Sequence, residues 1–476
     1  MHLNSVLLPP KVLWISTLIM IAPPLVKAQT VQEPGDLSAF KSPGPSWQMA
    51  GEVQASLETA GELILSPGNE ILVNQPTKKR KGQDIYTVNE YGDMELELDY
   101  LMARGSNSGI YLQGRYELQL LDSWGTSTPS YGDNGGIYER WDTSKPQGAE
   151  GYEGRAPRQN VSRAPGVWQH LKVSFRAPRF DAAGNKTENA IIERVVLNGA
   201  LIHENVILSG PTRGAVSETE AAKGPLRFQG DHGAVAFRNI RITSYDAGRE
   251  QSNEEERSLP DPIYVNAPVN TTLRSFMDIP GGKRVVHSIS VGNSEKVHYT
   301  YDLDHGSLFQ VWRGGFLNTT PMWHSRGDGS SRPRGALVFL GQPVLAVSQL
   351  SSADAYWPAD TSGSGFIPNG YTLDEENRPI FSYHVHGAEV KDATRALDKG
   401  EGLLREITVT GNGGNLYHLA ARSGEIKQIN RDTYLIGDNA WYLRINDGAK
   451  PILRENEGQQ ELIIPLNQKI SYSILF

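Results

Sequence analysis

Apolar and polar side chains alternate strictly over short segments of this chain, and this pattern constrains its fold more than any other feature. From Met94 to Tyr100, the apolar residues Met94, Leu96, Leu98 and Tyr100 occupy every second position. A period of two places them on one face of a β-strand and the charged residues on the other. Similar segments recur at 110–113, 116–120, 171–175, 194–197 and 235–242. The first half of the chain is therefore predicted to form an all-β sandwich.

Two short turns are predicted between these strands. Gly114-Arg115 separates the segments 110–113 and 116–120, and Asn198-Gly199 stands between Val196-Leu197 and Leu201-Ile202. Asn-Gly favours positive φ at both central positions of a two-residue loop, which is typical of a tight β-hairpin. We expect a hairpin at each place.

Composition divides the chain after its N-terminal segment into two β domains joined by a linker. Residues 47–245 form the first β domain, and the polar, acidic segment 246–261 is typical of a linker because it contains almost nothing to bury. Residues 262–476 again alternate like strands, at 285–291, 297–302, 337–340 and 463–474. They are predicted to form a second β-sandwich-type domain.

Residues 1–28 resemble an export signal. Lys11 precedes a mostly apolar stretch from Val12 to Val26, and Val26 and Ala28 suit cleavage before Gln29. The apolar run is short and contains two prolines, although a retained anchor is the alternative interpretation. We expect a periplasmic or secreted protein with no membrane insertion after signal cleavage.

Cysteine content and charge exclude several classes of protein. The chain has no cysteine, so neither disulfides nor a cysteine-linked lipid anchor can hold it. Its formal net charge is −8, and becomes about −10 once Lys11 and Lys27 are removed with the signal. Such a chain lacks the basic surface of a nucleic-acid-binding protein. Neutral ligands are the natural expectation.

Two segments of the first domain carry candidate functional groups. In the strand after Gly114-Arg115, Glu117 and Gln119 share one face, while Tyr116, Leu118 and Leu120 share the other. Asp122 lies where that strand ends. A carboxylate, an amide and a nearby guanidinium suit the hydroxyls of a sugar.

The second segment runs from Leu226 to Ile240. It contains Gln229-Gly230-Asp231-His232-Gly233, which places a glycine-flanked histidine in a turn between two strands. Such a position suits a reacting group better than a packed core residue.

These two segments, with Gly135-Gly136-Ile137-Tyr138, Trp168-Gln169-His170-Leu171 and the Asn198-Gly199 turn, resemble the 3-keto-disaccharide hydrolase domain family over residues 47–245. The resemblance implies a concanavalin-like jelly-roll fold, often described as glycoside hydrolase family 16-like. It also implies an oligosaccharide or glycoside substrate whose sugar carries a ketone at C3.

A C3 ketone acidifies the proton on C2, so a base can form an enolate that expels the group on C1. Such a site needs a base, a group that holds the enolate oxygen, and an acid for the leaving group. We expect Glu117 or His232 to be the base and Asp122 its partner or the acid. Arg115 and Gln119 would bind hydroxyls or the oxyanion.

Further substrate contacts are expected from Asn107, Tyr111, Gln229 and Trp124. Tyr111 and Trp124 either stack on sugar rings or fill the rim of the site. The family resemblance also allows a divalent cation, for which the candidate ligands are Glu117, Asp122, Asp231 and His232. Arg238 and Asn239 are expected to brace the last strand of the domain rather than to touch substrate.

Two other functions fit the same features. The protein could be a non-catalytic, lectin-like binding protein, or an interaction protein of a sugar-uptake system. Classical retaining hydrolysis is disfavoured, because Met102 stands where the Glu-x-Asp-x-x-Glu pattern starting at Glu97 requires its second glutamate.

In the second half, His384-Val385-His386 would place two imidazoles on one strand face, as some metal sites do, but a third ligand at a diagnostic spacing is missing. We expect this half either to bind carbohydrate or to stabilise the first domain.

Overall fold

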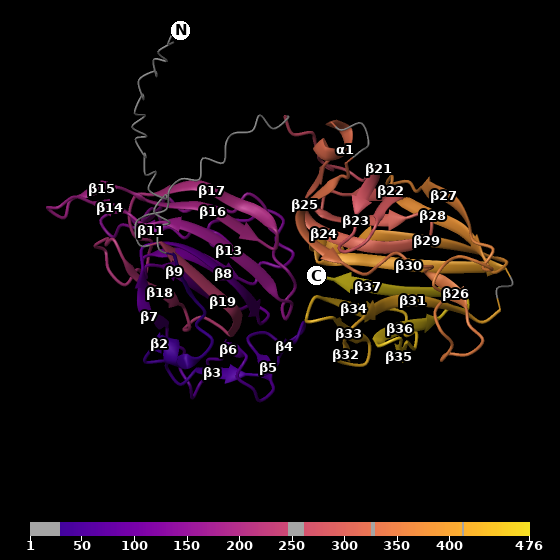
Figure 1. Cartoon of the computed structure of the whole chain (residues 1–476), viewed down its shortest axis with the longest axis horizontal. Coiled ribbons are helices and arrows are strands. Elements are labelled where there is room, and N and C mark those ends of the chain that lie inside the picture. Colours follow the sequence, from indigo (N-terminus) through magenta and orange to yellow (C-terminus); the bar gives the residue numbers. More distant parts are fainter. Residues whose placement is uncertain (1–28, 246–260, 325–328, 412–413) are drawn as a thin grey trace, which may run out of the picture.

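The computed structural model describes residues 29–245, 261–324, 329–411 and 414–476, and it consists almost entirely of β-strands (Figure 1). The described residues include one short α-helix, α1 (Thr320–His324), and the 3-10 turns η1 (Leu37–Ala39) and η2 (Asp398–Gly400). The all-β prediction is confirmed. None of the described helices has the length and apolar character needed to cross a membrane. The expected signal at 1–28 and nearly all of the expected linker, 246–260, lie outside the described residues.

The N-terminal domain contains two large antiparallel sheets. The eight-stranded sheet has the order β17-β16-β13-β8-β19-β6-β3, with β1 paired to β19. Its strands are β1 (Gln29–Gln32), β3 (Trp47–Ala50), β6 (Ile71–Asn74), β8 (Asp93–Met102), β13 (Gln169–Arg176), β16 (Ala190–Leu197), β17 (Ala200–Leu208) and β19 (Val235–Tyr245).

The five-stranded sheet has the order β10-β9-β18-β7-β2. Its strands are β2 (Phe40–Lys41), β7 (Ile85–Tyr91), β9 (Asn107–Leu112), β10 (Tyr116–Leu121) and β18 (Gly224–Phe228). Three small ribbons complete the domain, formed by β4 (Val53–Ala55) with β5 (Leu63–Leu65), β11 (Arg140–Trp141) with β12 (Gly151–Tyr152), and β14 (Arg179–Phe180) with β15 (Lys186–Glu188).

The core of this domain lies between the two sheets. Leu96 and Leu98 of the large sheet are fully buried, and they share one hydrophobic cluster with Leu118 and Phe228 of the smaller sheet. Apolar side chains therefore face inward from both sheets, as the alternation predicts. The polar positions of β9, β10 and β18 consequently lie on the face turned away from this core.

A hairpin forms at both predicted places, and the Asn198-Gly199 turn is confirmed. The first turn differs from the prediction, because three residues, 113–115, connect β9 to β10, with positive φ angles at Gln113 (52°) and Gly114 (66°) instead of a two-residue Gly114-Arg115 turn. The turn between β16 and β17 has φ angles of 51° at Asn198 and 82° at Gly199. Positive φ at both central residues matches the right-handed twist of the flanking strands. The first hairpin fixes the register of β9 against β10, so that Glu117 stands opposite Tyr111.

The C-terminal half contains three sheets. The first comprises β20 (Tyr264–Val265), β21 (Thr271–Asp278), β22 (Arg284–Gly292), β23 (Val297–Asp302), β24 (Ser307–Asn318) and β25 (Arg332–Phe339). The second comprises β26 (Val347–Gln349), β31 (Leu416–Ser423), β35 (Ile452–Asn456) and β36 (Gln459–Pro465). The third comprises β27 (Ile367–Leu373), β28 (Pro379–Val385), β29 (Ala388–Ala396), β30 (Gly402–Gly411), β32 (Ile426–Gln428), β33 (Thr433–Ile436), β34 (Trp441–Ile445) and β37 (Lys469–Leu475).

Two predictions for this half are wrong in detail. The segment 463–474 forms two strands in different sheets, because β36 ends at Pro465 and β37 begins at Lys469. Proline has no N–H to continue a ladder, so the chain can change sheets there.

His384 and His386 do not share a strand face either. His386 has left the strand with φ of 49° and forms the turn before β29, while His384 contacts the side-chain amide of Asn369 at 2.9 Å.

The two halves lie side by side, with the C-terminus between them (Figure 1). A shared apolar cluster brings together Leu57, Ala164 and Val167 of the first half with Leu435, Tyr442 and Leu475 of the second. Hydrogen bonds surround this cluster. The amide of Asn439 donates to the carbonyls of Val53 and Gly166, at 2.8 and 3.1 Å. The contact is therefore apolar at its centre and polar at its margin, like a protein–protein interface.

Candidate functional site

Paired strands place a row of polar and aromatic side chains across the outward face of the five-stranded sheet. Glu117 of β10 stands opposite Tyr111 of β9, Tyr111 opposite Arg227 of β18, and Arg227 opposite Tyr86 of β7. Residues opposite one another point to the same face, so these four side chains are neighbours. The site is thus built by strand register and not by a flexible loop.

Glu117 is the titratable group with the most unusual environment in this row. Its side chain is only 2% exposed, and burial raises its pKa to about 7. A hydrogen bond from Tyr111 and the charge of Arg227 oppose this increase, whereas the charges of Asp84 and Asp231 add to it. A carboxyl group with such a pKa can exchange a proton at neutral pH, which is the property required of a general base.

The backbone around Glu117 is held on both sides. Its N–H donates to the hydroxyl of Thr212 at 3.0 Å, and its carbonyl accepts the N–H of Tyr138 at 3.0 Å. Gly109, on the neighbouring strand, leaves the room that the carboxyl group occupies. A Cβ atom at Gly109 would lie 2.4 Å from Oε1 of Glu117.

Arg227 supplies a fixed positive charge next to Glu117. Its guanidinium forms an ion pair with Asp84 at 2.5 Å, donates to the carbonyl of Gly214, and lies 4.2 Å from the centre of the Tyr111 ring. Its Nε has no partner among the described residues. A cation held in this way can stabilise negative charge that develops on a ligand.

Side-chain amides form a second row beside the first. Gln119 donates to the amide oxygen of Asn107 at 3.1 Å, and the backbone of Gln229 donates to the carbonyl of Gly109. The side-chain oxygen of Gln229 is buried and has no partner in the described part of the chain. These amides offer both donors and acceptors, which suit hydroxyl groups.

Beyond β10, the segment 135–138 continues the sheet and adds aromatic groups. The N–H of Gln119 donates to Gly136, and the N–H of Gly135 donates back to Gln119. Tyr138 therefore lies next to Glu117. Burial is the larger cause of the raised pKa of Tyr138, and the charge of Glu117 is the second cause. Tyr131 packs edge-on against Tyr138, with 5.8 Å between ring centres.

The structure places the predicted residues Asp231 and His232 on the turn between β18 and β19. About half of each side chain is exposed, and Nδ1 of His232 contacts Oδ1 of Asp231. Asp231 is close enough for its charge to raise the pKa of Glu117. Among the described residues, the imidazole of His232 forms no hydrogen bond or ion pair with Glu117.

Other predicted residues lie away from Glu117. Asp122 is five positions further along the chain, about 17 Å in an extended strand. It accepts the backbone N–H of Gly105 at 2.8 Å and of Trp124 at 3.4 Å, and burial raises its pKa. Arg115 donates to the carbonyls of Gln113 and Thr219, at 2.9 and 2.8 Å.

Trp124 lies at the contact between the two halves. Its indole N–H donates to the carbonyl of Phe476 at 2.9 Å, and its ring packs against the interdomain cluster.

Arg238 and Asn239 lie on the outer face of the large sheet. Arg238 pairs with Asp438 of the second half at 2.6 and 3.0 Å, so it braces β19 against the other domain.

Three residues of the site, Arg227, Asp84 and Tyr138, were not among the residues predicted to function there. Arg227 stands between Leu226 and Phe228, which are both fully buried, so strand alternation alone could have placed it on the outward face with Gln229. Asp84 and Tyr138 carry no such signal, because their proximity to Glu117 depends on pairing between distant segments.

The residues of this site do not suit a resident metal ion. Asp84 is paired with Arg227, Glu117 is hydrogen-bonded to Tyr111, and Asp122 follows the end of β10, five positions from Glu117. In the described ranges, no three histidine or acidic side chains are grouped so that they could hold an ion.

Comparison with known proteins agrees with the resemblance seen in the sequence. Residues 35–243 match the family model of the 3-keto-alpha-glucoside-1,2-lyase-like domain, which makes this a carbohydrate-active type of domain. No curated protein sequence matches the chain.

Solved structures with similarity to this chain include two Parabacteroides distasonis proteins provisionally classed as glycosyl hydrolases. One is 26% identical, over 45% of this chain and 82% of the other, with a TM-score of 0.31. The second is 20% identical, over 45% of this chain and 99% of the other, with a TM-score of 0.29. The carbohydrate-binding module CBM66 of Bacillus subtilis is 10% identical over 42% of this chain and 98% of the module, with a TM-score of 0.21.

Proposed function

We propose that residues 35–243, a domain of the 3-keto-alpha-glucoside-1,2-lyase-like family, cleave 3-keto-glycosides with Glu117 as the general base. The observation that carries the proposal is a buried carboxyl group with a pKa of about 7, next to a guanidinium fixed by Asp84. A base with a pKa near the working pH combines a useful deprotonated fraction with a strong drive to accept a proton.

In the proposed reaction, the carboxylate of Glu117 removes the proton from C2 of the 3-keto sugar. The electron pair of that C–H bond forms an enolate, whose negative oxygen at C3 is held by the guanidinium of Arg227. The enolate collapses to a C1=C2 double bond and breaks the bond from C1 to the glycosidic oxygen. The departing oxygen takes the proton that Glu117 had received. Addition of water across the C1=C2 bond then gives the free 3-keto sugar.

Arg227 is suited to the oxyanion because it is held before the substrate arrives. The ion pair with Asp84 and the bond to Gly214 fix its position, so little reorganisation is needed as charge develops. The amides of Asn107, Gln119 and Gln229 would bind the sugar hydroxyls beside it. Tyr138, on the other side of Glu117, would contact the leaving group.

The first experiment compares a plain disaccharide with its 3-keto form and measures release of the sugars. We expect release only from the 3-keto form. Glu117→Gln should lower turnover about a hundredfold or more, as removal of a general base does. His232→Asn is the matched comparison and should change turnover only a few-fold, since His232 is half-exposed and its imidazole contacts Asp231.

Three results would contradict this assignment in different ways. Near-normal turnover by Glu117→Gln would exclude Glu117 as the base. A loss in His232→Asn as large as that in Glu117→Gln would make His232 part of the proton transfer. If neither substrate is cleaved, a lectin-like protein that binds sugar without turnover becomes the better description.

We also propose that the protein is exported and cleaved after Ala28, because residues 1–28 have the pattern of a signal. Mass spectrometry of the protein recovered from cells should give an N-terminus at Gln29. An intact N-terminus on protein recovered with the membrane fraction would contradict this proposal.

A further inference from the structure

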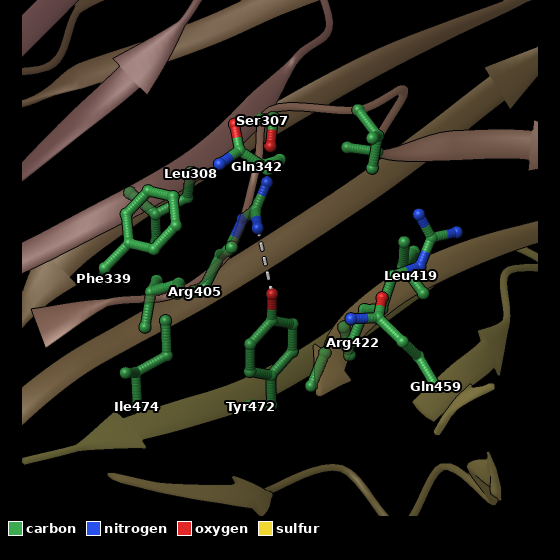
Figure 2. A pocket seen from close by; sticks show the side chains of 16 residues that line it. Ser307, Leu308, Phe339, Gln342, Arg405, Leu419, Arg422, Gln459, Tyr472 and Ile474 are labelled. Atoms are coloured by element: carbon green, nitrogen blue, oxygen red, sulfur yellow. Dashed lines mark hydrogen bonds between the residues drawn. The ribbon is translucent and has the colours of Figure 1, made fainter. Parts of the chain in front are cut away.

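A cavity of about 300 Å³ lies where the three sheets of the C-terminal half meet. Its wall combines the start of β24, the end of β25, β30, β31, β36 and β37. Apolar side chains line much of it, among them Leu308, Phe339 and Ile474, while Arg405 and Tyr472 lie side by side between these and the rim residues Arg422 and Gln459 (Figure 2). The volume is at the lower end of the range for ligand sites.

The polar groups at the floor of this cavity are held by a buried hydrogen-bonded chain. Nδ1 of His418 lies 2.9 Å from the carbonyl of Ala346, so this nitrogen must carry the proton. Nε2 of the neutral ring then accepts from the hydroxyl of Tyr472 at 3.0 Å. The hydroxyl in turn accepts an N–H of Arg405 at 3.0 Å.

Arg405 is charged and almost fully buried, and one of its N–H donors has no acceptor among the described residues. Its Nε and NH2 groups donate to the two carboxylate oxygens of Asp392, at 3.1 and 2.6 Å, and NH2 also donates to Gly306 at 3.4 Å. NH1 donates to Tyr472, which leaves one of the five N–H groups without an acceptor in the described residues. Tyr472 keeps one unused lone pair beside it.

The residues at the rim of the cavity add further hydrogen-bond donors, and none of them is an acidic residue. Arg422 is bound to Glu461 through Nε and NH2, whereas its NH1 has no acceptor in the described part of the chain. Gln342 and Gln459 are exposed at the opening, and Ser307 adds a hydroxyl. The lining residues include two arginines and neither an aspartate nor a glutamate. The N–H of Arg405 that lacks an acceptor belongs to a side chain that is only 4% exposed, whereas Arg422 is partly exposed. A buried N–H without an acceptor is costly, so the cavity favours a ligand that brings a negatively charged acceptor to Arg405.

We propose that this cavity is a second binding site, separate from the Glu117 site, for a small molecule that carries one carboxylate on a compact body of monosaccharide size. The carboxylate would lie against Arg405 and Arg422, and the apolar wall would contact the carbon skeleton. A sugar acid and a simple organic acid share this chemistry.

Calorimetric titration of the full chain tests the proposal with four probes: glucuronate, benzoate, glucose and inorganic phosphate, each at up to about 10 mM. We expect a carboxylate to bind at least about tenfold more tightly than glucose and phosphate, as expected when one charge-assisted contact is gained. Tighter binding of glucuronate than of benzoate would identify a sugar acid, and the reverse order a simple organic acid.

Variants at the rim test the location without disturbing the buried chain. Gln459 is exposed, so Gln459→Glu should fold normally and weaken carboxylate binding at least about fivefold, whereas Gln459→Lys should not weaken it. Gln428→Glu, on an exposed position of β32, is the control and should leave binding unchanged. Glu117→Gln should also leave it unchanged, which separates this site from the proposed catalytic one.

The proposal is overturned if neither carboxylate binds. It is also overturned if glucose or phosphate binds as tightly as the better carboxylate, or if Gln459→Glu has no effect on binding.

Discussion

Glu117 is buried as a carboxyl group whose pKa is about 7, so its ionisation must affect stability as well as activity. The pKa in the folded chain is higher than in the unfolded chain, where a glutamate titrates at about 4.3. The stabilisation from proton binding is therefore complete below about pH 4 and is lost as the pH rises from there through about 7, by up to about 4 kcal/mol.

We expect Glu117→Gln to raise the melting temperature at pH 8 by several degrees, because the amide never becomes charged. At pH 5 the increase in melting temperature should be much smaller, because only about 1 kcal/mol of the stabilisation has been lost at that pH. Calorimetry at both pH values measures the difference. An equal effect at pH 5 and pH 8 would mean that Glu117 does not titrate between them.

The rate of 3-keto-glycoside cleavage should depend on pH in the opposite direction to the stability. A base must be deprotonated, so kcat/KM should rise as the pH increases through about 7 and then level off. Rates measured from pH 5 to pH 9 give this profile. A flat profile over the same range would show that the carboxyl group of Glu117 does not limit the reaction.

At the scale of secondary structure, the pairing of β9 with β10 decides where the carboxyl group of Glu117 lies. A methyl group at Gly109 would approach Oε1 to 2.4 Å and force the carboxyl group to move. We expect Gly109→Ala to lower turnover about tenfold or more while the sheet remains folded, since misplaced reacting groups lose much of their rate. Gly424→Ala is the control, because a Cβ at Gly424 meets no atom within 4 Å. Unchanged turnover in Gly109→Ala would mean that Glu117 can act from a different position.

At the scale of the whole molecule, Arg238 joins the two halves. Its guanidinium pairs with Asp438 through two hydrogen bonds and lies 4.0 Å from the centre of the Trp168 ring. A lysine cannot reproduce the paired bonds or the stacking. We expect Arg238→Lys to lower the melting temperature by a few degrees and to leave kcat within about twofold. A scanning calorimetry trace and a rate measurement on the same preparation test this, and a large loss of kcat without a change in melting would contradict it.

Much of the fold can be predicted from the sequence, because local rules determine it. Alternation along β8 identifies the buried face, and Asn198-Gly199 specifies a turn through its positive φ angles. The same rule places Glu117 and Gln119 on one face of β10. Local rules fail where a strand changes its partner, as at Pro465, and where a residue leaves a strand, as at His386.

The sequence by itself determined the all-β class, the two hairpins and the polar face of β10, because each depends on residues close together in the chain. The match of residues 35–243 to the 3-keto-alpha-glucoside-1,2-lyase-like model agrees with the resemblance carried by motifs visible in the sequence. Only the tertiary structure placed Arg227 and Asp84 beside Glu117, Trp124 against Phe476, and Arg405 beside Tyr472 and His418. The physical reason is that burial and electrostatic fields come from neighbours brought together by strand pairing between distant segments. The pKa of about 7 at Glu117 is a property of that environment, which no short stretch of sequence contains.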